Sequence, residues 1–290
     1  MTNKNNPSTQ CHKAPRMLLR AREVIFLGTC RSRQEVYRTT QELMLVCLKG
    51  SMTIRHRDGS PVTTGTCLVP PGILLDRHRI DMREAVMGIC FLPPLSQAYP
   101  ALASLMAPVG DGIYCHHPHE AKVIATMTDV RNKGGITAGT ASAMIRASLI
   151  PEHLQNLTFR EFDPRVLTVA RRIRTSLHDA PALSDLAREV RLSESRLEKL
   201  FKEQAGLPIT QYRVRYRVFI STIIMALGYS VTEAALLGGF ANSAHLSRCY
   251  RQVNGLTPSS TFLHPPCLDA LLDDSAIELV APLLEGHAVS

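Results

Sequence analysis

The 290-residue sequence has no tryptophan and few aromatic residues of any kind, 5% in all. None of its eight cysteines belongs to a Cys-x-x-Cys pair, so neither a zinc ribbon nor a thioredoxin-type redox pair is indicated. No run approaches the roughly 18 apolar residues of a membrane span, and the polar first residues disfavour a secretory signal. These absences favour a cytoplasmic protein whose cysteines stay reduced.

Positive charge is unevenly distributed along the chain, which has a formal net charge of +8. Residues 1–158 carry +7 and residues 159–262 carry +6, whereas residues 263–290 contain no Lys or Arg and carry −5. A basic body most often indicates a polyanionic partner such as nucleic acid. The length suggests two domains, because a single domain usually has about 100–200 residues.

The N-terminal half has the pattern of a small β-rich unit behind a lead, 1–18, that is predicted to be disordered. Short apolar and β-branched runs alternate with turn residues, which predicts a sandwich or an open barrel. Residues 97–150 are predicted to be helical and to pack on the sheet or on a second subunit. We therefore expect an α+β fold with a regulatory or dimerisation domain at 19–158. The predicted strands include 43–48, 52–56 and 62–69.

The region 159–262 has apolar residues at helical spacing almost throughout, which predicts an all-α domain. Ser193 is placed to cap one helix, and Ser230 with Glu233 forms the S-x-x-E capping box of another. Between them, 209–227 is predicted to form a helix of about 19 residues, roughly 28 Å long.

A duplication lies within this helical region. Residues 187–195 align with residues 235–243 at an offset of 48, and after a one-residue insertion the alignment continues at an offset of 49. Each copy has the pattern of a short helix, a tight turn, a longer helix and a glycine stop, which is typical of a helix-turn-helix unit. Because one turn of B-DNA is about 34 Å, the joining helix could hold two recognition helices in successive major grooves without a dimer. A helical bundle with chance repetition is the alternative. The pairs at an offset of 49 are Leu197 with Leu246, Lys199 with Arg248, Phe201 with Tyr250, Lys202 with Arg251, Gly206 with Gly255 and Leu207 with Leu256.

Residues at fixed spacings extend across both copies. They are Leu183-Ser-Asp-Leu-Ala187, Leu192-Ser193, Leu197, Leu200-Phe201-Lys202, Gly206, Gln211-Tyr212, Arg217, Val231-Thr-Glu233, Ala235, Gly239-Phe240, Leu246-Ser-Arg248, Gly255 and Thr257-Pro258-Ser259. This set resembles the DNA-binding domain of the AraC/XylS family of bacterial transcription regulators. The resemblance implies a bacterial, cytoplasmic regulator, usually an activator that contacts RNA polymerase. The sequence departs from the family pattern at Arg191, which replaces a turn glycine, at Ala234, and at Thr261-Phe262.

The residues expected to meet DNA lie on the second helix of each copy, away from its apolar face. Lys199 can donate to guanine, Glu198 can accept from cytosine, and Arg248 offers a fork of donors. A solvated Glu/Lys face is the alternative for Glu198. The joining helix also carries three arginines that could either support the scaffold or bind DNA: Arg213, Arg215 and Arg217. The candidate base contacts are Ser195, Glu198, Lys199, Ser243, Ala244, His245, Ser247 and Arg248, and the candidate phosphate contacts are Lys202 and Arg251.

The N-terminal half resembles the cupin-like barrel often found ahead of this DNA-binding domain, through residues 50–56 and 65–72. The histidines of metal-binding cupins are largely missing from it, and the cluster 116–120 lacks the spacing that would converge its ligands. No metal and no cofactor are therefore expected. A basic cluster of Arg77, His78, Arg79 and Arg83 is either an anionic effector site or an exposed loop face.

The acidic tail, 263–290, combines apolar residues with its carboxylates. It either docks on the protein or is a disordered solubilising segment. The leading hypothesis is a DNA-binding transcription regulator without enzymatic activity. It would be controlled by a small-molecule effector or a regulatory protein, with a homodimer possible and no membrane partner. The alternatives are a cupin-type metalloenzyme with an accessory DNA-binding module and an architectural DNA binder.

Overall fold

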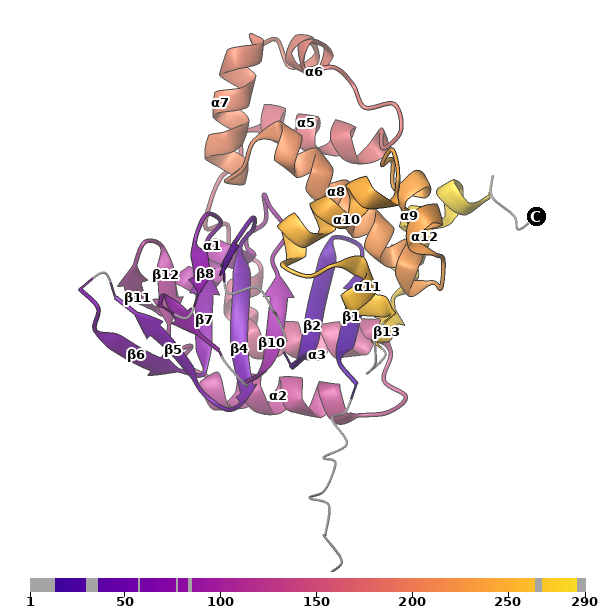
Figure 1. The fold of residues 1–290 in the computed structure, drawn as a ribbon. Helices are drawn as coiled ribbons and strands as arrows, with labels where there is room; N and C mark the ends of the chain where they lie inside the picture. The colour runs from indigo at the N-terminus through magenta and orange to yellow at the C-terminus, as the bar shows by residue number, and fades with distance from the viewer. Residues whose placement is uncertain are drawn as a thin grey trace, which may run out of the picture.

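The computed structural model describes residues 14–29, 36–56, 58–76, 78–82, 85–263 and 268–285. Its N-terminal half is built on an eight-stranded sheet of order β11-β12-β7-β4-β10-β2-β1-β13 (Figure 1). Two smaller sheets, β3-β8 and β6-β5-β9, complete an open rather than a closed barrel. The strands are β1 (Arg16–Arg20), β2 (Glu23–Thr29), β3 (Val36–Arg38), β4 (Leu43–Lys49), β5 (Met52–Arg55), β6 (Pro61–Thr64), β7 (Thr66–Val69), β8 (Leu74–Asp76), β9 (Ile80–Asp81), β10 (Val86–Phe91), β11 (Ala107–Gly110), β12 (Ile113–Cys115) and β13 (Asp269–Leu272).

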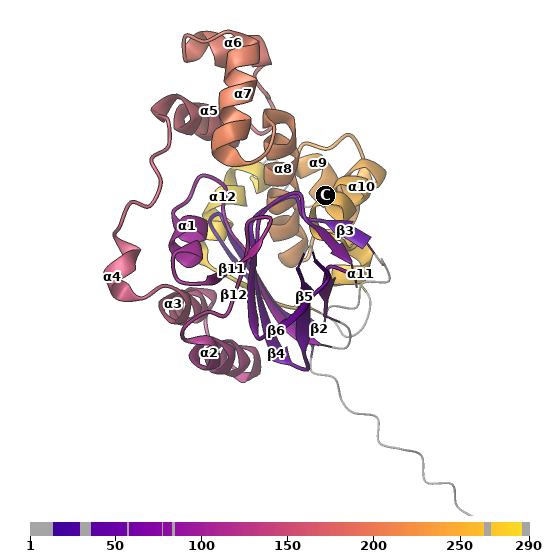
Figure 2. The same ribbon diagram turned by 90° about the vertical axis from the view of Figure 1, so that its left-hand side faces the viewer.

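The central strand β4 explains why this half contains apolar runs without polar alternation. Its residues Met44 and Val46 point to one face of the sheet, where helices α2 (Glu120–Asn132) and α3 (Ala138–Leu149) cover them (Figure 2). Leu45 and Cys47 point to the other face and pack against the smaller sheets. A strand that is covered on both faces requires apolar residues at every position.

The region predicted to be helical contains a hairpin as well. Helix α1 (Ala98–Ala103) is followed by β11 and β12, and only then by α2, α3 and the short α4 (Glu152–Gln155). Asp111 (φ 55°) and Gly112 (φ 73°) are both left-handed at the turn of this hairpin. Helical spacing of apolar residues before and after the turn concealed two short strands.

The first and last strands of the described residues, β1 and β13, lie side by side in the sheet. Strand β1 starts at Arg16, within the predicted lead, and residues 1–13 lie outside the described residues. Strand β13, from the acidic tail, pairs parallel with β1, and α12 (Asp274–Leu284) follows it. The described part of the tail is therefore docked on the protein.

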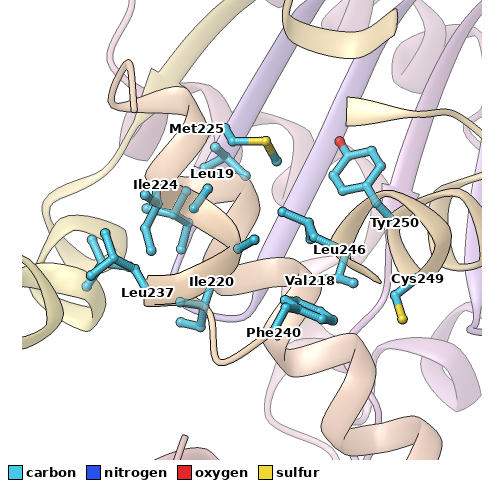
Figure 3. Packing of buried hydrophobic residues seen from close by; sticks show 14 of the residues in the cluster. Leu19, Val218, Ile220, Ile224, Met225, Leu237, Phe240, Leu246, Cys249 and Tyr250 are labelled. Carbon is cyan, nitrogen blue, oxygen red and sulfur yellow. The ribbon is translucent and has the colours of Figure 1, made fainter. Parts of the chain in front are cut away.

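The C-terminal half consists of helices around two separate apolar cores. The first core holds Phe201. The second core holds Tyr250 and also includes Met17 and Leu19 of the sheet. Figure 3 shows Leu19 and Tyr250 among the residues of this second core. Helix α8 contributes to both cores and connects them. None of the described helices is long and apolar enough to cross a membrane. The helices are α5 (Pro164–Thr175), α6 (Leu183–Glu189), α7 (Glu194–Ala205), α8 (Ile209–Ala226), α9 (Val231–Leu237), α10 (Ser243–Asn254) and α11 (Pro258–Phe262).

Candidate nucleic-acid interface

Two helix pairs, α6 with α7 and α9 with α10, have the same turn geometry. The turn residue is left-handed in both, Arg191 with φ 54° and Gly239 with φ 77°. One residue later, the N–H of Leu192 donates to the Ala187 carbonyl at 2.9 Å, and the N–H of Phe240 donates to the Ala235 carbonyl at 2.8 Å. The offset of 48 in the sequence is therefore also a repeat in three dimensions.

The longer helix of each pair starts and stops in the same way. The side chains of Ser193 and Asn242 cap α7 and α10 by accepting a hydrogen bond from the backbone N–H three residues later, at 3.3 and 2.8 Å. Gly206 and Gly255 end the two helices, both with φ 76°, a conformation that favours glycine. The two recognition helices consequently have equal lengths of 12 residues.

The outward faces of α7 and α10 carry every residue that was predicted to meet DNA. The apolar residues of these helices, among them Leu197 and Leu246, point inward and are fully buried. Whether the outward residues bind DNA stays a prediction. Exposed among them are Ser195, Glu198, Lys199, Lys202, Ala244, Arg248 and Arg251, and partly exposed are Ser243, His245 and Ser247.

The His245 ring has its orientation set by a neighbour. It lies edge-on to the ring of Phe240, with centroids 5.3 Å apart and an interplanar angle of 88°. In the first unit, the position equivalent to Phe240 at the offset of 48 holds the aliphatic Leu192. The two units thus present different side chains at the N-terminal ends of their recognition helices.

The three arginines of α8 make contacts inside the protein. Arg213 donates to the Pro181 carbonyl, Arg215 to the Thr40 carbonyl at 3.1 Å, and Arg217 to the Leu177 carbonyl at 3.2 Å. Burial lowers the pKa of Arg213, and the charge of Arg217 lowers it further. These contacts favour the scaffold role.

Sequence reasoning passed over Arg196, which is exposed on α7. It falls at the one-residue insertion between the two offsets, so the repeat gave it no partner to be compared with. Two further residues on α5, Arg171 and Arg172, are also exposed. The sequence could have indicated their exposure, because they lie on the polar face of an amphipathic helix. The first unit therefore has more exposed cations than its recognition helix alone provides.

Comparison with known proteins bears on this region. A model of the helix-turn-helix domain matches residues 186–263. The HTH-type transcriptional regulator RipA of Corynebacterium glutamicum is 29% identical over 82 residues, which cover 28% of this chain and 25% of RipA. The HTH-type transcriptional regulator GbdR of Pseudomonas aeruginosa is 26% identical over 96 residues, or 33% of this chain and 26% of GbdR. The match thus spans about a quarter of either relative.

Residues 186–263 form an AraC-type helix-turn-helix domain. The fold extends the likeness beyond this domain. An apo ToxT variant from Vibrio cholerae matches with a TM-score of 0.52 at 12% identity, over 83% of this chain and 97% of that one. At this identity the likeness concerns the fold alone, an N-terminal β-rich half followed by the AraC-type domain.

A cavity of about 450 Å³ lies between the sheet and the AraC-type domain. One wall is formed by apolar residues of β2, β4 and β10, and the opposite wall by α8, α10 and the segment up to α11. Ligand pockets in proteins commonly have about 300–1,000 Å³. The residues that line it include Val24, Phe26, Leu43, Leu45, Ile89 and Phe91 of the sheet and Tyr212, Tyr216, Phe219, Tyr250 and Val253 of the helices.

Cationic groups also line this apolar cavity. Arg22 has a left-handed backbone, with φ 70°, and its pKa is lowered by burial and by the charge of Arg174. Arg174 donates to the hydroxyl of Tyr212 at 2.6 Å. Within the described part of the chain, neither arginine forms an ion pair. Two cations without a carboxylate partner therefore line the cavity.

The basic cluster predicted to hold an effector lies elsewhere. Arg79 forms an ion pair with Asp111 at 2.6 Å, and His78 is exposed. Neither residue lines the cavity. Arg77 and Arg83 lie outside the described residues. An effector role of this cluster stays a prediction, and the cavity arginines were missed because they come from segments 152 residues apart in the sequence.

The histidine cluster at 116–120 is used for structure. The Nε2 atom of the buried His117 lies 2.8 Å from the Leu149 carbonyl, and its Nδ1 accepts from the His119 backbone N–H at 3.1 Å. Glu120 accepts from the Thr66 hydroxyl at 2.7 Å. Within the described ranges, no group of three or more His, Cys, Asp or Glu residues is arranged to hold a metal ion.

The first helix-turn-helix unit is also joined to the N-terminal half by hydrogen bonds. The side-chain oxygen of Gln97 accepts from the backbone N–H groups of Phe159 and Arg160, both at 3.0 Å. Glu42 lies at this junction, where burial raises its pKa to about 7 although Arg215 and Arg160 lower it. The first unit is thus attached through residues 156–163, a segment that Gln97 holds near the half-buried Glu42.

Proposed function

We propose that the protein is a sequence-specific transcription regulator that binds promoter DNA through α7 and α10. The duplicated unit carries the proposal, because two capped recognition helices of equal length direct polar and cationic side chains outward. Helix α8 has 18 residues. Its length is about 27 Å, comparable with the roughly 34 Å between successive major grooves. One chain therefore contains both DNA readers.

The proposed activity is activation in the cytoplasm of a bacterium, with RNA polymerase as the protein partner. The AraC-type domain supports a role in transcription regulation for this chain. RipA and GbdR, which match the same region, are named transcriptional regulators. DNA binding needs no second copy in this proposal. A homodimer would use the outward faces of α2 and α3, where Met144 is 37% exposed.

The proposed control is a small molecule in the cavity between the sheet and the AraC-type domain. The walls are largely apolar, and the exposed Arg22 and the half-buried Arg174 offer positive charge at a cavity that Asp81 also lines, so the expected ligand has an apolar body and one anionic group. A regulatory protein would instead need an exposed patch of about 800 Å². Because both halves line the cavity, a ligand there would change how they fit together.

The DNA proposal is tested by selecting genomic fragments on the purified full chain, followed by footprinting and titration of the selected site. We expect a discrete footprint covering two successive major grooves. The double variant Lys199→Ala with Arg248→Ala should lose discrimination between the site and a scrambled sequence. A protein that coats DNA without any discrete site would be an architectural binder, which would refute the proposal.

The ligand proposal is tested with apolar carboxylates and their primary amides, which differ only in the anionic group. Carboxylates should raise the melting temperature of the wild type, and Arg22→Gln should remove the preference over the amides. Arg171→Gln is the matched control, because Arg171 is exposed on α5 and lies outside the cavity. Equal responses to both ligand series in the wild type would rule out an anionic ligand.

A further inference from the structure

The acidic tail lies outside the AraC-type domain, which ends at residue 263, yet it contacts both halves of the molecule. Strand β13 pairs with β1 in parallel register, from Arg16 opposite Asp269 to Leu19 opposite Leu272. Helix α12 then packs against α8 and β1 (Figure 1). One short segment thus connects the regulatory sheet to the domain that carries the recognition helices.

The side chains of the tail enter two different cores. Leu271 packs in the core between the sheet and helices α2 and α3, whereas Leu272 faces the core of the second helix-turn-helix unit. Ala276 and Val280 of α12 are fully buried in that second core. The alternation of side chains along a strand explains how neighbours reach opposite faces.

The negative charges of the tail meet arginines of the sheet. The side chain of Arg16 is only 8% exposed, and its guanidinium contacts Asp269 at 2.6 Å. The same guanidinium donates to the carbonyls of Val130 and Lys133 at 2.5 and 2.7 Å. Without Asp269, a buried cation would keep only carbonyl partners, which is costly.

A second ion pair holds the start of α12. Arg20 lies 3.5 Å from Asp273, the capping residue of this helix. The backbone N–H of Asp273 donates to the Leu19 carbonyl at 2.9 Å, and the N–H of Ala21 donates to the Ser275 hydroxyl at 3.1 Å. Residues 269–275 of the tail are therefore fixed to β1 and Ala21 by backbone, charge and apolar contacts.

We infer that residues 268–285 form a strap that holds the second helix-turn-helix unit on the regulatory sheet and restrains its binding to DNA. The inference rests on the proposed function. The strap limits how far the second recognition helix can adjust to a major groove. The strap also lies beside the ligand cavity, because Met17 lines the cavity and belongs to the same core as Ala276 and Val280. Ligand binding and strap release are thus coupled through β1.

A reversible lock tests the strap in the full chain. Ala21→Cys together with Ser275→Cys puts a thiol on each of the two residues that are joined by the hydrogen bond from the Ala21 backbone N–H to the Ser275 hydroxyl, and oxidation should join them. The DNA probe is the site selected from genomic fragments. We expect the oxidised protein to bind it at least tenfold more weakly than the same protein after reduction. Each single-cysteine variant is the control and should not respond to reductant.

A weakened strap should have the opposite effect. Asp269→Asn with Asp273→Asn removes both ion pairs, while asparagine still caps α12. Asp274→Asn with Glu278→Gln is the matched control, because it removes two charges from exposed positions. The strap variant should bind the site several-fold more tightly than the wild type, and the control should not. Thermal melts establish that both variants fold.

The outcomes separate the strap from the proposed function. Equal DNA affinity of the oxidised and reduced lock would overturn the strap alone. An equal gain in the strap variant and its control would also overturn it, because the effect would then come from the charge of the tail. If neither the wild type nor any variant binds a discrete site, the proposed function fails and the inference fails with it.

Discussion

The first helix-turn-helix unit, α6 with α7, meets the N-terminal half through Leu95 and through residues 156–163, which Gln97 holds. The second unit, α9 with α10, shares a core with the sheet, forms a wall of the cavity and is fastened by the tail. The units are repeats in sequence and in turn geometry. Their difference teaches that duplication fixed the fold of each unit, while the surrounding elements attach the two units differently to the N-terminal half.

The largest expected effect compares the two cores. Phe201 and Tyr250 occupy equivalent positions and are fully buried. Replacing either residue by alanine should cost about 3–5 kcal/mol of local or global stability. Phe201→Ala should speed amide exchange in α5 to α7 only. Tyr250→Ala should speed amide exchange in the second unit and, in addition, in β1 and β13. Hydrogen exchange followed by mass spectrometry measures both patterns, and identical patterns would contradict the unequal attachment.

A pH effect is expected at the junction of the first unit. Burial raises the pKa of Glu42 from 4.5 to about 7, so the folded protein keeps a proton there that the unfolded chain releases. This contribution to stability is fully present below about pH 4.5 and is lost as the pH rises through about 7, amounting to about 3 kcal/mol. Glu42→Gln should flatten the change between pH 5 and 8 in urea titrations.

The control for this effect is Glu198→Gln, which removes an exposed carboxylate on α7. It should leave the pH dependence of the wild type intact. If Glu42→Gln keeps the same slope as Glu198→Gln, the carboxyl group at the junction does not titrate in this range.

The second unit should make two types of DNA contact, one to bases and one to phosphates. Arg248→Ala should weaken binding to the selected site by about 1–3 kcal/mol and relax its specificity. Arg251→Ala, one helical turn further along α10, should weaken binding to all sequences alike and reduce the salt dependence. Titrations on the selected and scrambled sites at two salt concentrations measure both. Unchanged affinity of Arg248→Ala for the selected site would defeat its assignment.

The smallest effect concerns the turns. Arg191 adopts a left-handed conformation that favours glycine, so Arg191→Gly should change stability by about 1 kcal/mol or less, in the stabilising direction. Gly239→Ala should destabilise by more, because an added Cβ would lie 3.3 Å from the Leu177 carbonyl oxygen and from the Arg217 Nε atom. Urea titration measures the free energy of unfolding of both variants. Changes of equal size and opposite sign would mean that the contacts around Gly239 do not add to the cost of its substitution.

Much of the helical half was predictable, because helices depend on contacts within a few residues. The Ser230–Glu233 capping box, the glycine stops and the inward apolar faces are all local patterns, and the structure contains each of them. The turn at Arg191 was signalled by the turn glycine that Arg191 replaces in the family pattern and by Gly239 at the same position of the other copy. The hairpin β11–β12 was missed because short strands leave a weak pattern beside helices.

The sequence by itself determined the duplicated unit and the outward residues of its recognition helices, since both follow from helical periodicity. Only the tertiary structure decided where the cavity and the strap lie. Arg22 and Arg174 line one cavity, and Arg16 meets a carboxylate 253 residues away, through contacts that leave no periodic signal in one sequence. The acidic tail was visible from its charge, but its partner was decided by the free edge of β1, which only folding creates.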